Sequence, residues 1–345
     1  MKKKQKIFVG VSGGVDSSVA VYLLKKQGYD VHGIFVKTWS PEWLPCTWVD
    51  EKRDAMRVCA VLDIPFHFLG AEEDYKHGVA EYMIAEYRAG RTPNPDVLCN
   101  RVIKFGVMWE YAKSHGAHAI ATGHYAQVID GYLHKGVDES KDQSYFLWML
   151  TQQELQHVVF PIGHLHKSEV RKIAEKAGLF TNTKKDSQGI CFLGDVDMRE
   201  FLAHYIEQKP GPVVTTEREV VGEHDGIWFY TLGERHGFRI TAQSSDQKPY
   251  YIVEKNITDN TLVVSHASKI ESKNKKQTVI LRESSGLQKG SYEAQVRYHG
   301  ELIPAKVTNT TTVELAYKGV IPLGQSLVLY KGDRLVGGGI IDQTI

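Results

Sequence analysis

Residues 7–22 read Ile-Phe-Val-Gly-Val-Ser-Gly-Gly-Val-Asp-Ser-Ser-Val-Ala-Val-Tyr, and this stretch decides the fold. A short apolar run stops at Ser12-Gly13-Gly14, and the apolar residues that follow recur at helical spacing. The pattern predicts a strand, a tight loop and a helix. Glycine lets the backbone approach a ligand, and N–H groups of a first helical turn point at negative charge. The loop is therefore expected to bind an anion.

The residue types in this loop separate two kinds of phosphate site. The phosphate loop of kinases and GTPases closes on Lys-Ser/Thr, whereas Asp16 and Ser17 occupy the matching positions. A carboxylate beside phosphates is repulsive unless a divalent cation lies between them, so Asp16 favours Mg²⁺ and a polyphosphate. The stretch resembles the Ser-Gly-Gly-x-Asp-Ser loop of ATP pyrophosphatases, which split ATP between the α and β phosphates. The alternative is an ordinary glycine turn.

Length, charge and cysteine content limit the classes of protein to which this sequence can belong. The chain has 345 residues, enough for two or three domains, and its formal charge of +1 means that any RNA site must be a local patch. Neither a signal peptide nor an apolar span of membrane length is recognisable, so we expect a cytoplasmic protein with no membrane partner. Widely spaced cysteines without a C-x-x-C pair favour neither a disulfide framework nor a zinc site. They are Cys46, Cys59, Cys99 and Cys191.

Strand-like and helical runs alternate in the first half of the chain. This pattern predicts an α/β fold with a doubly wound parallel sheet, whose ligands collect at the carboxyl ends of the strands. Residues 12–17, 36–37 and 123–124 lie at such ends. The expected strands cover 31–36, 66–69 and 117–122, and the expected helices cover 52–62, 78–88 and 101–115.

The composition changes near Lys209-Pro210-Gly211-Pro212, beyond which short β-like runs such as 227–230 dominate. We therefore expect a catalytic ATP-binding domain over residues 1–208. A small central β-rich module would cover 209–270, and a C-terminal β-barrel-like module would cover 271–345.

Cys99 and Cys191 are the candidate reactive thiols. Cys99 follows a proline-stiffened segment and comes just before the helix expected at 101–115, where a lowered pKa is expected. Asp96, three residues earlier, is a candidate general acid or base. Cys191 follows a polar loop, which favours accessibility. A buried, inert thiol is the better interpretation of Cys46 and Cys59.

Six motifs carry a specific resemblance along almost the whole chain. The motifs are Thr92-Pro-Asn-Pro-Asp-x-x-Cys99-Asn, Ala121-Thr-Gly-His-Tyr125, Lys141-Asp-Gln-Ser-Tyr-Phe-Leu147, Asp186-Ser-x-Gly-Ile-Cys-Phe192, Phe229-Tyr-Thr-Leu-Gly233, and Gly324-Gln-Ser326 with Gly337-Gly-Gly339. With them the sequence resembles the tRNA-specific 2-thiouridylase family, which replaces the C2 oxygen of the wobble uridine in certain tRNAs by sulfur.

The resemblance implies a role for each matched residue. Cys191 would carry a persulfide received from a donor or relay protein, and Cys99 would be the second, nucleophilic thiol. The target base would meet Asn94, Pro95 and Asp96. ATP, with Mg²⁺, would be bound by Gly10, Val11, Ser12, Gly13, Gly14, Val15, Asp16, Ser17, Val36 and Gly123. Contacts with tRNA would come from His124, Lys141, Asp142, Gln143, Arg297, Tyr298 and Gln325.

The implied chemistry is adenylation of the uridine C2 oxygen, with release of pyrophosphate, followed by attack of sulfur and departure of AMP. Sulfur would come directly from the Cys191 persulfide, or as sulfide released when Cys99 attacks it and leaves a Cys99–Cys191 disulfide. The sequence leaves both routes open.

Two rival functions use the same features. An amide-forming ATP pyrophosphatase would need an ammonia source, and the sequence has no glutaminase signature. An RNA-binding or sulfur-carrier protein without adenylation would tolerate loss of Asp16. At the residue level, His124 could equally be a packed histidine, and Arg297-Tyr298 is more often a solvated strand face.

Overall fold

A computed structural model describes residues 4–44, 48–186, 197–241, 248–266 and 276–345. The chain forms two compact units. The first contains Met1–Ala80, Pro95–Asp195 and Tyr330–Val336, and the second contains Glu81–Asn94, Val196–Leu329 and Gly337–Ile345. Residues 81–94 therefore group with the β-rich part of the chain. The three domains at 1–208, 209–270 and 271–345 stay a prediction.

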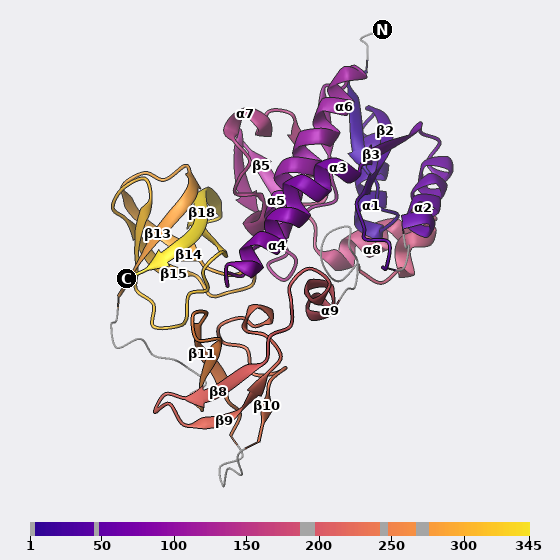
Figure 1. The fold of residues 1–345 in the computed structure, drawn as a ribbon. Coiled ribbons are helices and arrows are strands. Elements are labelled where there is room, and N and C mark those ends of the chain that lie inside the picture. Colours follow the sequence, from indigo (N-terminus) through magenta and orange to yellow (C-terminus); the bar gives the residue numbers. More distant parts are fainter. Residues whose placement is uncertain (1–3, 45–47, 187–196, 242–247, 267–275) are drawn as a thin grey trace. The chain divides into compact units, whose positions relative to one another are not determined.

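The first unit is built on a five-stranded sheet in which each neighbouring pair is parallel (Figure 1). This confirms the predicted parallel sheet, and each expected strand is present. The order is β3 (Phe66–Ala71), β2 (Asp30–Thr38), β1 (Lys6–Gly10), β4 (Ala119–Ala121) and β7 (Val158–Val159).

Helices cover both faces of this sheet, as a doubly wound fold requires. On one face, apolar residues of β1 and β2 share a core with α1 (Val15–Lys26), α2 (Trp48–Val61) and α8 (Lys167–Lys176). On the other face, Phe8 of β1 packs near Tyr111 of α6 (Met108–Ser114). Across the described ranges, no helix combines the length and the apolar character that a bilayer span needs.

Shorter elements complete the first unit. They are α3 (Glu72–Tyr75), the π-helix η1 (Lys76–Ala80), α5 (Pro95–Leu98), the π-helix η2 (Cys99–Val107), β5 (Ala126–Ile129), β6 (Tyr132–Lys135), the 3₁₀ helices η3 (Ser144–Leu147) and η4 (Phe180–Thr183), and α7 (Gln152–Leu155).

Two expected elements need correction. The helix expected at 101–115 begins at Pro95, because the first turn of a helix accepts proline, whose missing N–H would be unpaired there. The run 227–230, expected to be β-like, is the 3₁₀ helix η5 (Ile227–Phe229). Short apolar runs do not distinguish the two conformations by periodicity.

The second unit begins with α4 (Glu81–Arg88) and also holds α9 (Met198–Ala203) and two β modules. The central module is a five-stranded sheet in the order β10 (Arg239–Ile240), β9 (Val220–His224), β8 (Gly211–Thr215), β12 (Thr261–Ser265) and β11 (Tyr251–Asn256).

The C-terminal module is a closed six-stranded antiparallel barrel, as expected. Its strands follow the order β13 (Gln277–Ser285), β16 (Thr312–Leu315), β15 (Ile303–Val307), β14 (Gly290–Gln295), β17 (Ser326–Lys331) and β18 (Arg334–Thr344). Pairing of β18 back onto β13, for example Leu281 opposite Ile341, closes the ring.

Phe8 offers a test of the central strand. Its side chain is fully buried between β2 and α6, so Phe8→Ala should lower the free energy of unfolding by about 3–5 kcal/mol, through lost burial and the cavity left behind. Phe68 on β3 is 41% exposed, and Phe68→Ala should cost less than about 1 kcal/mol. Urea unfolding measures both, and equal losses would contradict the placement of Phe8 in the core.

Candidate functional site

The predicted anion loop is present between β1 and α1. Val11 donates its N–H to the Ile34 carbonyl at 2.8 Å, which ties the strand end to β2. The Ser17 hydroxyl accepts from the Ser12 N–H at 3.3 Å and donates to the Gly14 carbonyl at 3.2 Å. Gly13 has φ of 73°, and a Cβ there would lie 2.8 Å from the Asp54 Cβ. Glycine is therefore required at this position.

The end of β4 lies directly against this loop. A Cβ on Gly123 would lie 2.7 Å from the Ser17 backbone nitrogen and 2.8 Å from the Asp16 carbonyl carbon. The parallel register of β1 and β4, with Val9 opposite Ala121, produces this approach. Gly123 and residues 12–17, expected at neighbouring strand ends, are thus brought together. Val36 is buried near the end of β2.

Asp16 is held by two residues from distant parts of the chain. Both of its carboxylate oxygens accept from the Lys167 ammonium at 2.8 Å, and one accepts from the Tyr125 hydroxyl at 2.7 Å. Burial and the adjacent Asp16 carboxylate raise the pKa of Tyr125, so its hydroxyl stays protonated and donates. The loop carboxylate therefore has a fixed orientation.

Asp186 lies at the centre of a cluster of cations. Its carboxylate pairs with Lys167 at 2.8 Å, Arg171 at 2.8 Å and Lys141 at 2.9 Å. Partial burial raises the pKa of Asp186, but hydrogen bonds from Lys167 and Lys141 outweigh it and lower that pKa to about 2. Asp186 remains charged at neutral pH. Lys167 thus links Asp16 to the residue that stands five positions before Cys191 in the sequence.

The cations around the loop suit a polyphosphate. Lys184 donates to the Gly13 carbonyl at 3.2 Å and pairs with Asp54 at 2.8 Å. With Lys167, this places two ammonium groups beside the loop backbone. Among the residues that the structure describes, no group of three or more His, Cys, Asp or Glu is arranged to hold a metal. A magnesium ion at Asp16 would therefore take most of its ligands from phosphate and water.

No role in the site was expected for the side chains of Lys167, Arg171, Lys184 or Tyr125. The lysines and the arginine lie beyond the strand–loop–helix pattern, and Lys167 is 151 residues from Asp16 in the chain. The motif that contains Tyr125 was recognised, but its hydroxyl partner depends on tertiary contacts.

Cys99 and Asp96 lie in one continuous helical run, with Asp96 in α5 and Cys99 at the start of η2. Asp96 is half-buried and Cys99 is fully buried. Cys191 and Cys46 lie outside the described residues, so the expected meeting of Cys99 and Cys191 stays a prediction. Cys59 is buried as expected, and burial raises the pKa of its thiol to about 12.

His124 is 6% exposed and lies between two partners, the Thr122 hydroxyl at 2.6 Å and the Lys104 ammonium at 3.4 Å. Burial and the Lys104 charge hold the pKa of His124 well below its ordinary value, so the imidazole is neutral. The packed-histidine alternative describes these surroundings, and contact with tRNA stays a prediction.

The other expected RNA-contacting residues of the first unit have internal partners. Lys141 pairs with Asp186, and the Gln143 side chain accepts from the Tyr125 N–H at 3.1 Å. Asp142 accepts from the N–H groups of Gly136 and Ser144 at 2.9 and 3.1 Å. Burial raises the pKa of Asp142, although these bonds oppose the change. Their contacts with RNA stay predictions.

In the second unit, Arg297 is exposed and Tyr298 is half-buried, just beyond β14. Asn94 is half-buried, and Pro95, in the first unit, begins α5. Gln325 uses its side-chain amide within the unit, on the carbonyls of Thr92 and Pro93.

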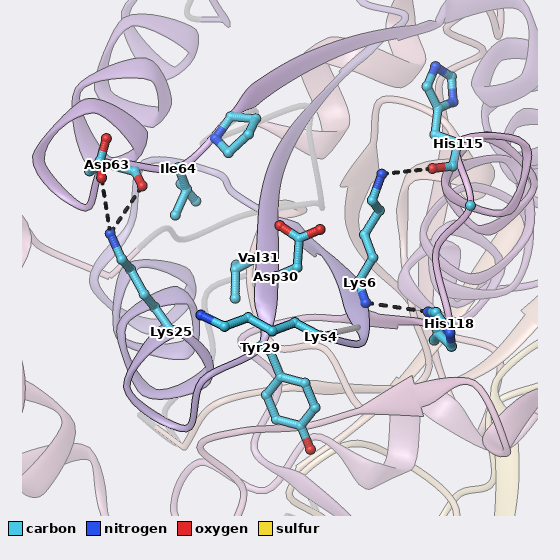
Figure 2. Close-up of a pocket in the computed structure, with 12 residues that line it drawn as sticks. Lys4, Lys6, Lys25, Tyr29, Asp30, Val31, Asp63, Ile64, His115 and His118 are labelled. Atoms are coloured by element: carbon cyan, nitrogen blue, oxygen red, sulfur yellow. Dashed lines mark hydrogen bonds and ion pairs between the residues drawn. The ribbon is translucent and has the colours of Figure 1, made fainter. Parts of the chain in front are cut away.

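A cavity of about 690 Å³ lies at the opposite edge of the parallel sheet, near the first residues of β1 and β2 (Figure 2). Two of its lysines bind main-chain carbonyls just beyond helix ends: Lys6 donates to His115 at 3.2 Å, and Lys25 donates to Asp63 at 3.0 Å. Cations at helix C-termini are stabilising, so we assign these lysines a structural role.

Comparisons with known proteins give the family. Three family models match in order: "tRNA methyl transferase HUP domain" over residues 5–195, "tRNA methyl transferase PRC-barrel domain" over 199–266, and "Aminomethyltransferase beta-barrel domain" over 259–341. Proteins named tRNA-specific 2-thiouridylase MnmA from Streptococcus thermophilus and Enterococcus faecalis are each 42% identical to this chain, over 99% of it and 96% of theirs. The chain belongs to the tRNA-specific 2-thiouridylase MnmA family.

Membership of the MnmA family confirms the resemblance that the six motifs indicated. Among solved structures, the U34-tRNA thiolase NcsA from Methanococcus maripaludis aligns with 59% of this chain and 66% of that chain, with 19% identity and a TM-score of 0.37.

The neutral state of His124 predicts a pH dependence of stability. As pH falls from 7 to 5, the unfolded chain gains a proton on this histidine that the folded chain does not, so stability falls by up to about 1.4 kcal/mol per pH unit. Urea unfolding of His124→Gln should show a shallower loss than the parent protein. His164→Gln, at an exposed position, is the control, and equal slopes for both variants would contradict a neutral buried His124.

Proposed function

We propose that this protein is an ATP-dependent tRNA 2-thiouridylase, a sulfurtransferase that replaces the C2 oxygen of the wobble uridine in tRNA by sulfur. The observation that carries the proposal is the loop at residues 12–17, with Asp16 held by Lys167, in a chain 42% identical to proteins named tRNA-specific 2-thiouridylase. ATP supplies the adenylyl group that turns a poor leaving group into a good one.

The residues around the loop would bind and orient the triphosphate. Backbone N–H groups of residues 12–17 and the start of α1 would face the phosphates, and Lys167 and Lys184 would add positive charge. The uridine C2 oxygen would attack the α phosphorus, and the α–β bridging bond would break to release pyrophosphate. Mg²⁺ bound by the phosphates would offset their repulsion from Asp16.

Sulfur delivery would use Cys191 and Cys99. The terminal sulfur of a Cys191 persulfide, or sulfide released from it, would attack C2 and displace AMP. Cys99 would attack the Cys191 sulfur, so that a Cys99–Cys191 disulfide forms and an external thiol must reduce it before the next turnover. Because Cys99 is fully buried in this structure, its thiol would have to become accessible during the cycle. Asp96, in the same helical run, would act as the general acid or base.

The target base would be taken out of the anticodon loop and meet Asn94, Pro95 and Asp96. In a loop that is already single-stranded, extrusion costs a few kcal/mol at most, and phosphate contacts would offset it. Arg297 and Tyr298 remain candidates for such contacts, with Arg297 exposed on the surface.

The decisive assay incubates purified protein with ATP, Mg²⁺, unmodified tRNA and either sulfide or a persulfide donor, then digests the RNA for mass spectrometry. We expect 2-thiouridine, AMP and pyrophosphate in equal amounts. Asp16→Asn should lower the rate by at least about tenfold, because the amide carries no charge to pair with Lys167 and only its oxygen can accept a hydrogen bond from the ammonium. Absence of 2-thiouridine under conditions where tRNA binds would overturn the proposal.

Two further experiments distinguish the roles of the two thiols and test the rival functions. Cys191→Ser should lose persulfide-dependent turnover but keep activity with sulfide, whereas Cys99→Ser should lose persulfide-dependent turnover. An arm with S-adenosylmethionine tests the methyl transfer that the family models' names mention, and methylated uridine without 2-thiouridine would replace the proposal. Asp16→Asn also addresses a binding protein without adenylation, which would be unaffected by this change.

A further inference from the structure

The segment Gly90–Pro93 joins α4 to the residues proposed to meet the target base, and it has no regular secondary structure. Such a segment must find partners for its backbone polar groups outside a helix or a sheet. Both β modules of the second unit supply those partners.

The segment starts at a glycine that ends α4. The Gly90 N–H donates to the Tyr87 carbonyl at 2.8 Å, and the Arg91 N–H donates to the Glu86 carbonyl at 3.0 Å. Gly90 has φ of 74°, as expected of a glycine that terminates a helix. The Lys255 ammonium of the central module donates to the Gly90 carbonyl at 3.1 Å. The start of the segment is therefore fixed by α4 and by β11.

The barrel fixes the other end of the segment. The Thr92 N–H donates to the Leu323 carbonyl at 2.9 Å. The Gln325 Nε2 group donates to the carbonyls of both Thr92 and Pro93, at 2.8 and 3.1 Å. Gly324, at φ of 89°, lies so close that a Cβ there would be 3.0 Å from the Thr92 carbonyl oxygen. Leu323, Gly324 and Gln325, which directly precede β17 of the barrel, thus hold Thr92 and Pro93 in place.

A buried ion-pair cluster strengthens the same connection. Glu86 of α4 is 3% exposed, accepts two hydrogen bonds from Arg91 at 2.8 and 2.6 Å, and also pairs with Arg282 of β13. Burial raises the pKa of Glu86, but the two arginines outweigh this and hold it below its ordinary value. A charged Glu86 therefore joins α4, the segment and the barrel at neutral pH.

We propose that Gln325 is a positioning residue, which fixes Thr92 and Pro93 so that Asn94 is presented to the target base. The inference rests on the proposed function for the role of Asn94, and it gives Gln325 a role inside the protein in addition to the tRNA contact that stays a prediction. Both hydrogens of the Gln325 amide are used by the two carbonyls, so its donor capacity is spent within the protein. Its effect on turnover then passes through the segment.

The test compares Gln325→Ala and Gln325→Glu with matched changes at Gln277. The Gln277 Nε2 group, also on the barrel, bridges the carbonyls of Tyr317 and Gly319 at 2.9 Å each, so it has the same chemistry without touching the segment. Hydrogen exchange in the free protein should show the Thr92 amide exchanging about tenfold faster in both Gln325 variants, because the hydrogen bonds to the Thr92 and Pro93 carbonyls are lost. Gln277→Ala should leave that rate unchanged.

The same variants are then assayed for 2-thiouridine formation and for tRNA affinity. We expect kcat to fall about tenfold in Gln325→Ala, with the Kd for tRNA changed less than about threefold, because the two hydrogen bonds that are lost lie within the protein. Gln277→Ala should retain both values. Unchanged Thr92 exchange, or a loss confined to tRNA affinity, would overturn the positioning role. If no variant and no parent protein made 2-thiouridine, the proposed function would fail, while the exchange result would still decide whether Gln325 holds the segment.

Discussion

The ammonium of Lys167 lies between two carboxylates, Asp16 of the loop after β1 and Asp186, with 2.8 Å to each. Without it, two negative groups would face one another at the edge of the sheet where a polyphosphate is expected. Arg171 and Lys141 add to the cluster through Asp186. The geometry of the candidate site depends on this shared cation, since it connects the loop, α8 and the end of the described segment 48–186.

The Lys167 ammonium also bears on whether Asp16 needs a magnesium ion. From the sequence, a carboxylate in a phosphate loop favours Mg²⁺, because the carboxylate and the phosphates repel each other unless a divalent cation lies between them. The structure supplies Lys167 as a cationic partner, so Asp16 is paired before any nucleotide arrives. The donors around Asp16 still fit a nucleotide that brings its own magnesium, with phosphate oxygens as most of the ligands.

The sequence was sufficient for features that local pattern determines. The strand, loop and helix at residues 7–22, the parallel sheet and the closed C-terminal barrel were all predicted correctly. The predicted start of the helix near Cys99 was wrong. The two prolines favoured a helix that begins after them, whereas Pro95 itself is the first helical residue. Asp16 and Gln325 bind partners that are 151 and 233 residues away in the sequence. Rules of residue spacing do not predict contacts between residues so far apart in the chain. The full burial of Cys99 was likewise not expected, because its place just before a helix start suggested a reactive thiol of lowered pKa.

Closure of the barrel by the β13–β18 pair has a consequence for association between chains. An open sheet exposes a row of unpaired N–H and C=O groups, on which another chain can add a strand and start aggregation. In this module, pairing of Leu281 with Ile341 and of Val279 with Thr344 uses those groups internally. The barrel therefore offers no long free edge among its six strands, whereas the central module has two edge strands, β10 with two residues and β11 with six. Addition of a strand from another chain would therefore involve the edge of the central module at β11, and not the closed barrel.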